Sequence, residues 1–198
     1  MIAFLALSLL AQAASSLAPA VKSFVSVDAS KVALVHVRVI DGTGAAARDD
    51  QTVLLENGRI AAIGPAQATP PPAGARVLDL RGASVLPGLV GMHDHLFYPA
   101  GGALFHEMGR SFPALYLAAG VTTIRTTGSV EPYTDLELKK LIDAGKTPGP
   151  RIHVTGPYLE GQDQFTPQMH AIASPADARR TVEFWAEQGP LRSRRTTR

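Results

Sequence analysis

The sequence has no cysteine among its 198 residues. Disulfide bonds and metal sites built from thiolates are therefore excluded. The absence of cysteine does not distinguish a cytoplasmic from an exported protein, because a chain without thiols suits the redox conditions on either side of a membrane. The kind of site that the chain can build must therefore be inferred from its other side chains.

The sequence also lacks a strong excess of charge of either sign. Its net charge is +2, and four arginines lie in its last seven residues, so that without them the charge would be −2. The basic residues therefore belong to the end of the chain and not to a patch on a folded surface. We expect no nucleic-acid partner, because such proteins carry clustered basic side chains on the fold itself.

The N-terminus lacks one part of a secretory signal, namely a lysine or arginine before the apolar run. The remaining parts are present: an apolar segment of signal length and the small-x-small cleavage pattern Ala11-Gln12-Ala13. The segment is short for a bilayer span. We predict a signal peptide over residues 1–19, a periplasmic or secreted protein, and no stable membrane span after cleavage. The alternatives are an N-terminal anchor and a misassigned start codon, which would leave the protein in the cytoplasm.

Residues 30–86 have the pattern of a small all-β block. The dipeptide Asn57-Gly58 is the strongest hairpin signal in the chain, and His36 lies within an alternating pattern that favours a strand residue over a ligand. The expected strands are Ala33–Ile40, Thr52–Glu56, Arg59–Ile63, Ala75–Leu80 and Ala83–Leu86.

From residue 87 to residue 189, strand and helix patterns alternate. Val121–Thr126 is rich in β-branched residues and predicts a strand, and Arg151–Thr155 predicts another. The first expected helix is Leu104–Ala119, opened by His106 and Glu107 and broken or kinked at Pro113. The second is opened by the capping box Thr134-x-x-Glu137 and ended by Gly145, and the third runs from Ser174 to Gln188. Three strand-helix units in succession are typical of a barrel or a doubly wound sheet.

The stretch Val85–Leu96 ends in two histidines, His93 and His95, which are two positions apart. Its apolar residues predict a buried strand, in which alternate side chains point to the same face. Two neutral imidazoles on one face can hold one metal ion, and Asp94 would point the other way. In a parallel barrel such a pair lies at the carboxyl end of the strand, where the active site opens. On its own, His-x-His is also a common coincidence.

The run Val85-Leu-Pro-Gly-Leu-Val-Gly-Met-His-Asp-His95 resembles the first barrel strand of the amidohydrolase superfamily. The wider stretch Val35–Gly189 resembles its imidazolonepropionase-related and dipeptidase-like branch. By position, His93 and His95 match the family's first pair of metal ligands. The His-x-His-x-Asp-His pattern of metallo-β-lactamase-like hydrolases is a rival, but Phe97 and Tyr98 stand where that pattern needs Asp and His.

The resemblance implies an α/β fold in which a small β-sandwich precedes a TIM (β/α)8 barrel. We interpret residues 30–86 as an incomplete β-sandwich subdomain and residues 87–189 as the first three units of a partial barrel. The resemblance also implies one or two divalent metal ions, with zinc expected, and hydrolysis of C–N bonds other than ordinary peptide bonds through a metal-activated water. The expected substrate is a small amide or cyclic amide.

The chain is short for this architecture, because a complete (β/α)8 barrel takes about 250 residues. In the resembling family the remaining metal ligands and the catalytic aspartate come from later strands, so we expect the catalytic residues beyond the C-terminus. Residues 190–198 form a basic tail without apolar alternation, of the kind that a frameshift or premature stop produces. We expect the chain as given to be truncated and inactive. The alternative is a genuine short protein that completes its site by pairing with another chain.

Five further polar residues are candidates for roles near the site. Tyr98 could line the substrate mouth or pack on the barrel rim, and His170 lies in a long loop that could contact substrate. Arg125 could face the barrel mouth or a structural carboxylate. We expect His153 to pack or to form a hydrogen bond. His106 is interpreted as structural, because the zinc motif His-Glu-x-x-His would need a histidine where Arg110 stands.

Other functions stay open at the level of the sequence. A deaminase or a dipeptidase-type, Xaa-Pro-like hydrolase of the same fold is one alternative, because the loops that would discriminate these activities are mostly absent. A fragment without enzymatic activity, or an interaction module, is the other. The oligomeric state is not indicated by any feature of the sequence.

Overall fold

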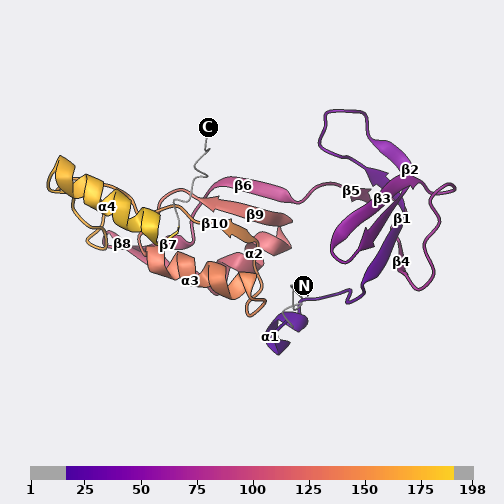
Figure 1. The fold of residues 1–198 in the computed structure, drawn as a ribbon, viewed down its shortest axis with the longest axis horizontal. Coiled ribbons are helices and arrows are strands. Elements are labelled where there is room, and N and C mark those ends of the chain that lie inside the picture. The colour runs from indigo at the N-terminus through magenta and orange to yellow at the C-terminus, as the bar shows by residue number, and fades with distance from the viewer. Residues whose placement is uncertain (1–16, 190–198) are drawn as a thin grey trace, which may run out of the picture.

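The computed structural model describes residues 17–189, which form an elongated molecule with two parts (Figure 1). An all-β part and a mixed α/β part are joined by the extended chain between β5 (Ser84–Val85) and β6 (Leu89–Asp94). The short helix α1 (Pro19–Lys22) lies near the junction, where the Ala18 amide donates a hydrogen bond of 3.0 Å to the carbonyl of Gly145. None of the helices in this range is long and apolar enough to cross a membrane. The predicted signal peptide and basic tail lie mainly or wholly outside the described residues.

The all-β part is one five-stranded sheet with the order β3-β2-β1-β4, in which β5 also pairs with β1. The strands besides β5 are β1 (Lys31–Val39), β2 (Arg48–Glu56), β3 (Arg59–Pro65) and β4 (Arg76–Asp79). Its core contains the buried valines Val37, Val39 and Val53. The second layer of the expected sandwich is not among the residues that the structure describes.

The predicted hairpin at Asn57-Gly58 is confirmed. It joins the antiparallel strands β2 and β3, and both turn residues have positive φ, 49° at Asn57 and 73° at Gly58, as a two-residue hairpin turn requires. His36 lies within β1, as predicted, but with a φ of 58° next to a break in the register. Its Nδ1 atom lies 2.7 Å from Oδ1 of Asp50, which also has a positive φ.

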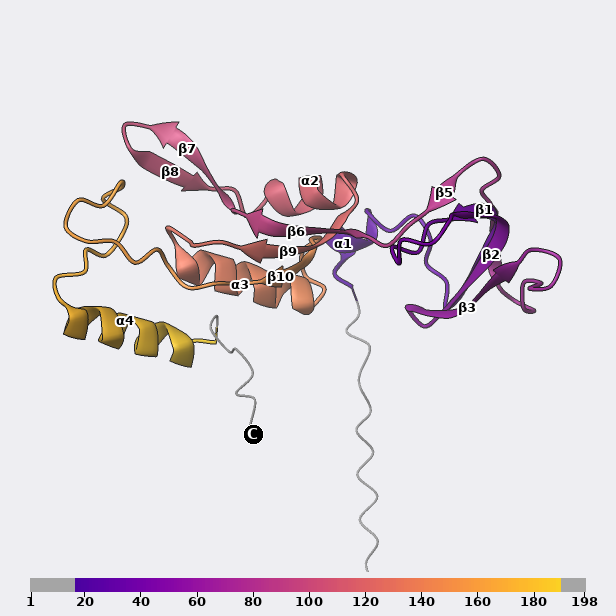
Figure 2. The ribbon, with the colours of Figure 1, turned by 90° about the horizontal axis from the view of Figure 1, so that it is seen from above.

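The mixed part is built on a parallel sheet with the order β10-β9-β6. Strand β9 (Val121–Thr126) has the predicted bounds, whereas β10 (Arg151–His153) is shorter than expected. Helices α2 (Phe112–Ala118) and α3 (Pro132–Asp143) pack on the same face of the sheet, because their apolar side chains join a single cluster around Ile124. Helix α4 (Pro175–Glu187) lies at the end of the molecule away from the all-β part, as both views show (Figure 2).

The prediction that the strand before the histidines is buried was wrong. Leu89, Val90 and Met92 of β6 are 51%, 57% and 64% exposed. The reason is that β6 is the outer strand of a three-stranded sheet whose other face carries no helix in the described part of the chain. The three strands do not close into a barrel within residues 17–189.

The predicted helix from residue 104 was also wrong in its first half. The chain instead forms a hairpin of β7 (Phe97–Gly101) and β8 (Leu104–Glu107), and the helix begins only at Phe112. Three successive residues, from Gly101 to Ala103, have positive φ and make the turn. His106 and Glu107 therefore lie in a strand and do not open a helix. Pro113 does not kink α2, because it stands in its first turn, where the missing amide hydrogen has no partner to lose.

The ends of the later helices were predicted with mixed success. Helix α3 begins at Pro132 and not at the expected capping box, so Thr134 lies inside its first turn. A proline at the first position sets the start, because its φ is already helical. The stop at Gly145, with a φ of 66°, is confirmed. The start of α4 is confirmed as well, since the Ser174 hydroxyl accepts a hydrogen bond of 3.2 Å from the amide of Asp177.

Two threonines tie the carboxyl ends of β9 and β10 together. The Thr126 hydroxyl accepts a hydrogen bond of 2.9 Å from the amide of Thr155, and the Thr155 hydroxyl accepts one of 2.9 Å from the amide of Gly128. Thr126 is fully buried. The two bonds fix the loops that leave the sheet at the end where the histidines lie.

Three carboxyl groups gather between the hairpin and the start of α3. Burial, and then the charges of Asp135 and Glu131, raise the pKa of Glu107 to about 8. Burial also raises the pKa of Asp135 to about 6, against a hydrogen bond from Ser129 that lowers it. Both carboxylate oxygens of Glu107 and Oδ1 of Asp135 are buried without a hydrogen-bond partner among the described residues. The folded protein therefore favours the neutral form of Glu107 near neutral pH.

Replacing Thr126 with valine should lower the free energy of unfolding by about 1–2 kcal/mol, because the buried amide of Thr155 then loses its acceptor while the side-chain volume is kept. Urea denaturation followed by circular dichroism measures the change. The Thr126→Ser variant is the control, since it keeps the hydroxyl and removes only a methyl group. A valine variant as stable as the wild type would contradict the role of this bond.

Stability should fall as the pH rises from about 4.5 to about 8, because over this interval the folded chain holds the Glu107 proton that the unfolded chain has released. The Glu107→Gln variant removes the ionisation. We expect it to be more stable than the wild type by on the order of 1 kcal/mol at pH 8, after allowance for residual solvent screening, with no gain at pH 4. Urea midpoints across this range provide the test. Glu137→Gln, at an exposed position of α3, should follow the wild-type profile, and identical profiles for the two variants would contradict the assignment.

Candidate functional site

His93 and His95 lie at the carboxyl end of β6, with His93 as the next-to-last residue of the strand and His95 directly after it. Their ring centroids are 5.4 Å apart, and the rings are nearly perpendicular at 84°. His93 is exposed, and His95 is half-buried. The two imidazoles are therefore neighbours at the end of the sheet where the β9 and β10 loops also leave it.

Asp94, between the two histidines, turns toward helix α2. Burial first, and then the neighbouring carboxylate of Asp94, raise the pKa of Tyr116 in that helix to about 12. The Tyr116 hydroxyl donates a hydrogen bond of 3.1 Å to the carbonyl of His95. Oδ2 of Asp94 is buried without a hydrogen-bond partner among the described residues. The Tyr116 hydroxyl thus fastens the end of β6 to helix α2.

The donor atoms at this end of β6 suit a divalent metal ion of the zinc type, which binds neutral imidazole nitrogens. Two imidazoles that share a tetrahedral zinc, at about 2.0–2.1 Å from each nitrogen, have ring centroids about 5 Å apart. The 5.4 Å between His93 and His95 fits this arrangement. Within residues 17–189 no group of three or more histidine, aspartate or glutamate side chains lies close enough together to hold a metal. The described chain therefore offers two ligands.

Aromatic side chains from three separate segments pack around His95. The His95 ring lies 4.7 Å from the ring of Phe97 and 6.3 Å from that of Tyr158, between centroids. Phe105 packs on Phe97 at 5.2 Å, and Phe165 packs on Tyr158 at 5.4 Å. We call Phe97, Phe105, Tyr158 and Phe165 the aromatic wall. Two of its rings, those of Phe97 and Tyr158, lie beside the His95 imidazole.

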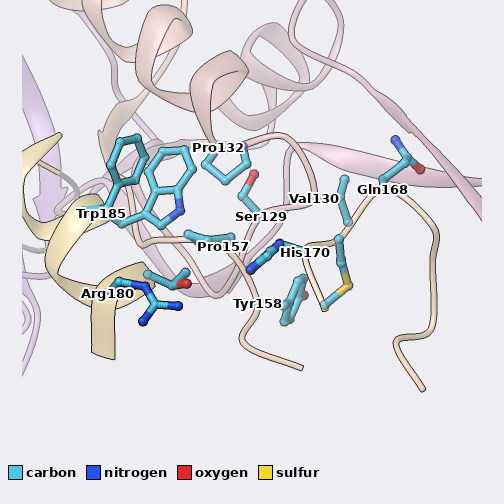
Figure 3. Close-up of a pocket in the computed structure, with 12 residues that line it drawn as sticks. Ser129, Val130, Pro132, Pro157, Tyr158, Gln168, His170, Arg180 and Trp185 are labelled. Atoms are coloured by element: carbon cyan, nitrogen blue, oxygen red, sulfur yellow. The ribbon is translucent and has the colours of Figure 1, made fainter. Parts of the chain in front are cut away.

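A cavity of about 390 Å³ lies on the far side of Tyr158, between the loop that follows β10 and helix α4 (Figure 3). Its apolar lining includes Pro132 and Trp185, and its polar lining includes His170 and Arg180. A second cavity of about 410 Å³ shares Tyr158 and Trp185 and reaches Arg125 at the end of β9. Tyr158 thus contacts His95 and also lines both cavities.

Asp177 holds the two basic groups at the rim of the first cavity. Its Oδ1 atom lies 3.2 Å from a guanidinium nitrogen of Arg180, and its Oδ2 atom lies 3.4 Å from Nε2 of His170. A hydrogen bond from the Ala173 amide, together with His170 and Arg180, lowers the pKa of Asp177, while desolvation opposes the change. The carboxylate therefore stays ionised and orients both basic side chains.

The structure distributes the residues that the sequence singled out over several surfaces. His170 and Arg125 line cavities beside Tyr158, whereas Tyr98 lies in β7, is 63% exposed, and has its ring 6.4 Å from that of Phe112. Tyr98 does not line either of the two cavities that share Tyr158. His153 is exposed on β10 and not packed, contrary to expectation.

Two residues near the histidines were missed by the sequence analysis. The hydroxyl oxygen of Tyr158 lies 3.4 Å from Nδ1 of His95. The side-chain amide of Gln168 accepts a hydrogen bond of 2.9 Å from the Phe105 amide and donates one of 3.2 Å to the Phe105 carbonyl, which ties the long loop to strand β8. The position of Tyr158, five residues after the parallel strand β10, was the available signal.

Comparisons with known proteins support the resemblance. No protein-family model matches the chain. A dihydroorotase of Syntrophus aciditrophicus is 42% identical over 106 residues, which cover 53% of this chain and 24% of that protein. An imidazolonepropionase of Salinispora arenicola is 38% identical over 95 residues, which cover 48% of this chain and 23% of that protein. The chain thus spans about a quarter of the length of these relatives.

Solved structures match a longer part of the chain. A Bifidobacterium longum protein described as a prolidase superposes with a TM-score of 0.67 at 32% identity, over 81% of this chain and 39% of that one. A Xaa-Pro dipeptidase superposes with a TM-score of 0.67 at 21% identity, over 81% of this chain and 45% of that one, which supports the fold alone. The matches cover the N-terminal portion of those structures. The chain is therefore a relative within the amidohydrolase superfamily.

Proposed function

We propose that this chain carries the first pair of metal ligands of a metal-dependent amidohydrolase, which cleaves C–N bonds of small amides or cyclic amides. The observation that carries the proposal is the pair His93 and His95, whose rings lie 5.4 Å apart at the carboxyl end of a parallel strand. The relatives named above are hydrolases of this superfamily, which supports the proposed type of reaction.

The two histidines would hold a divalent ion, with zinc expected, and such an ion would lower the pKa of its bound water to about 7. The other residues of this chain contribute binding and orientation. The aromatic wall packs beside the His95 imidazole. Asp177 holds His170 and Arg180 at the rim of the adjoining cavity, where polar groups of a substrate could be bound. Tyr98, on the exposed hairpin, stays a candidate for the outer mouth.

We infer that the uncovered face of the sheet corresponds to the inside of a (β/α)8 barrel. The parallel order β10-β9-β6 and the helices on one face support this inference. The exposed apolar side chains of β6 would then be covered by further strands. A catalytic zinc normally takes three protein ligands, and the described residues offer two. We therefore expect weak metal binding and no turnover by these 198 residues alone.

A dipeptidase-type activity is the second candidate. The 32% identity to the Bifidobacterium longum protein favours it, because that match covers 81% of the chain. The cavity beside Tyr158 combines an apolar lining with two basic side chains at its rim, which suits a substrate with an apolar ring and a carboxylate.

Export of the protein stays a proposal based on its first residues.

Zinc titration of the metal-free chain by calorimetry should give one site per chain. His93→Ala and His95→Ala should each weaken binding at least tenfold, because each removes one of two nitrogen ligands. His106→Ala is the matched control, since it removes an exposed histidine from β8 and should bind zinc as the wild type does. No binding by the wild type, or equal losses in all three variants, would refute the metal site.

Trp185, the only tryptophan, lines both cavities beside Tyr158, so its fluorescence reports their occupancy. Proline, as a product analogue of a dipeptidase, and hydantoin, as a cyclic amide, can be titrated separately. A carboxylate ligand should quench or shift the emission of the wild type, and the effect should weaken at least threefold in Arg180→Met. Quenching by hydantoin alone would favour a cyclic amidase over a dipeptidase, and a response to neither ligand would contradict the cavity as a substrate site.

A further inference from the structure

The loop after β10 brings a tyrosine hydroxyl to the outer nitrogen of one predicted metal ligand. Oη of Tyr158 lies 3.4 Å from Nδ1 of His95, at the long end of the hydrogen-bonding range, and the two ring planes are inclined by 36°. Both side chains are half-buried. Within residues 17–189 the ring of His93 makes no comparable hydrogen bond. The two histidines of the pair therefore differ in how firmly their rings are held.

The position of Tyr158 is determined by close packing against the backbone. Gly128 has a φ of +97°, and a Cβ atom added there would lie 2.5 Å from Cε1 of Tyr158. The Tyr158 amide donates a long hydrogen bond of 3.4 Å to the carbonyl of Ser129, and Phe165 packs on the outer side of the ring. Gly128 is itself held by the hydrogen bond that its amide donates to the Thr155 hydroxyl. The hydroxyl is thus aimed at His95 by the ends of β9 and β10.

A neutral imidazole carries its proton on one of its two nitrogens, and the hydrogen-bond partner of one nitrogen determines whether the other can bind a metal. A histidine that binds a metal usually donates its second ring N–H to an oxygen, which fixes the tautomer and the direction of the ring. A phenol oxygen can accept such a bond. When Nδ1–H of His95 donates to Tyr158, the proton is absent from Nε2, and the lone pair of that nitrogen is free.

We propose that Tyr158 is a positioning residue for His95. Its phenol oxygen accepts a hydrogen bond from Nδ1–H, holds the imidazole in the Nδ1–H tautomer, and leaves Nε2 for a divalent cation. The proposal deepens the proposed function and rests on it for the identity of the ligand. The aromatic wall supports the arrangement, because Phe165 packs on the Tyr158 ring and Phe97 packs on the His95 ring.

The test uses the full chain and the variants Tyr158→Phe and Gly128→Ala. Nitrogen-15 spectra of the metal-free protein, recorded at one pH at which histidine is neutral, report the tautomer of His95. The wild type should show the Nδ1–H form. Tyr158→Phe should show a shift toward the Nε2–H form and a zinc affinity about tenfold lower, in line with other losses of a ligand's outer partner. Gly128→Ala should show the same two changes, because the added Cβ displaces the ring.

Tyr133→Phe is the matched control, since it removes a hydroxyl from an exposed tyrosine of α3 that packs on Trp185. It should keep the wild-type tautomer and zinc affinity. A Tyr158→Phe variant with the wild-type tautomer would overturn the proposal, even if its zinc affinity fell. If the wild type binds no zinc but Tyr158→Phe changes the tautomer, the proposed function fails while the positioning role stands. If Gly128→Ala does not fold, the Tyr158→Phe result decides alone.

Discussion

The parallel pairing of β6 with β9 is the constraint on which the rest of the mixed part depends. It aligns Leu89 with Val121 at one end and Asp94 with Thr126 at the other, with irregularities in the register between them. The Thr127 amide then donates to the carbonyl of Asp94 at 3.1 Å, which carries the pairing past the end of the strand. Because parallel strands end at the same edge, this pairing brings the histidines to the loops of β9 and β10.

Within residues 17–189, helices cover only one face of this sheet, so the apolar core forms on that face. The covered face carries the apolar cluster around Ile124 and Ile152, which are almost completely buried. Strand β6, at the edge of the sheet, leaves large apolar side chains in contact with water, at a cost of about 25 cal/mol for each Å² that could be buried. Under the proposed function, further strands would cover this part of the sheet.

The surroundings of His95 depend on contacts between segments that are far apart in the sequence. Gln168 binds the backbone of Phe105, 63 positions away, and Tyr158 reaches His95 across the same separation. The loop after β10 is thus held at both its start and its middle. The buried carboxyl of Glu107 lies in β8, the same strand whose Phe105 backbone binds Gln168 of this loop. The protonation of Glu107 and the anchoring of the loop therefore concern the same small region.

Much of the local structure, and the proximity of His93 to His95, were determined by the sequence itself. The turn at Asn57-Gly58, the strand Val121–Thr126, the stop at Gly145 and the cap at Ser174 follow from backbone preferences that act over a few residues. The spacing of His93 and His95 placed two imidazoles together in the same way. Only the tertiary structure decided that Leu104–Glu107 is a strand, that β6 is exposed, and that Tyr158 meets His95. These outcomes depend on the pairing of β8 with β7, on a face left without cover, and on a partner 63 residues away, and the spacing of apolar residues along the chain does not record them.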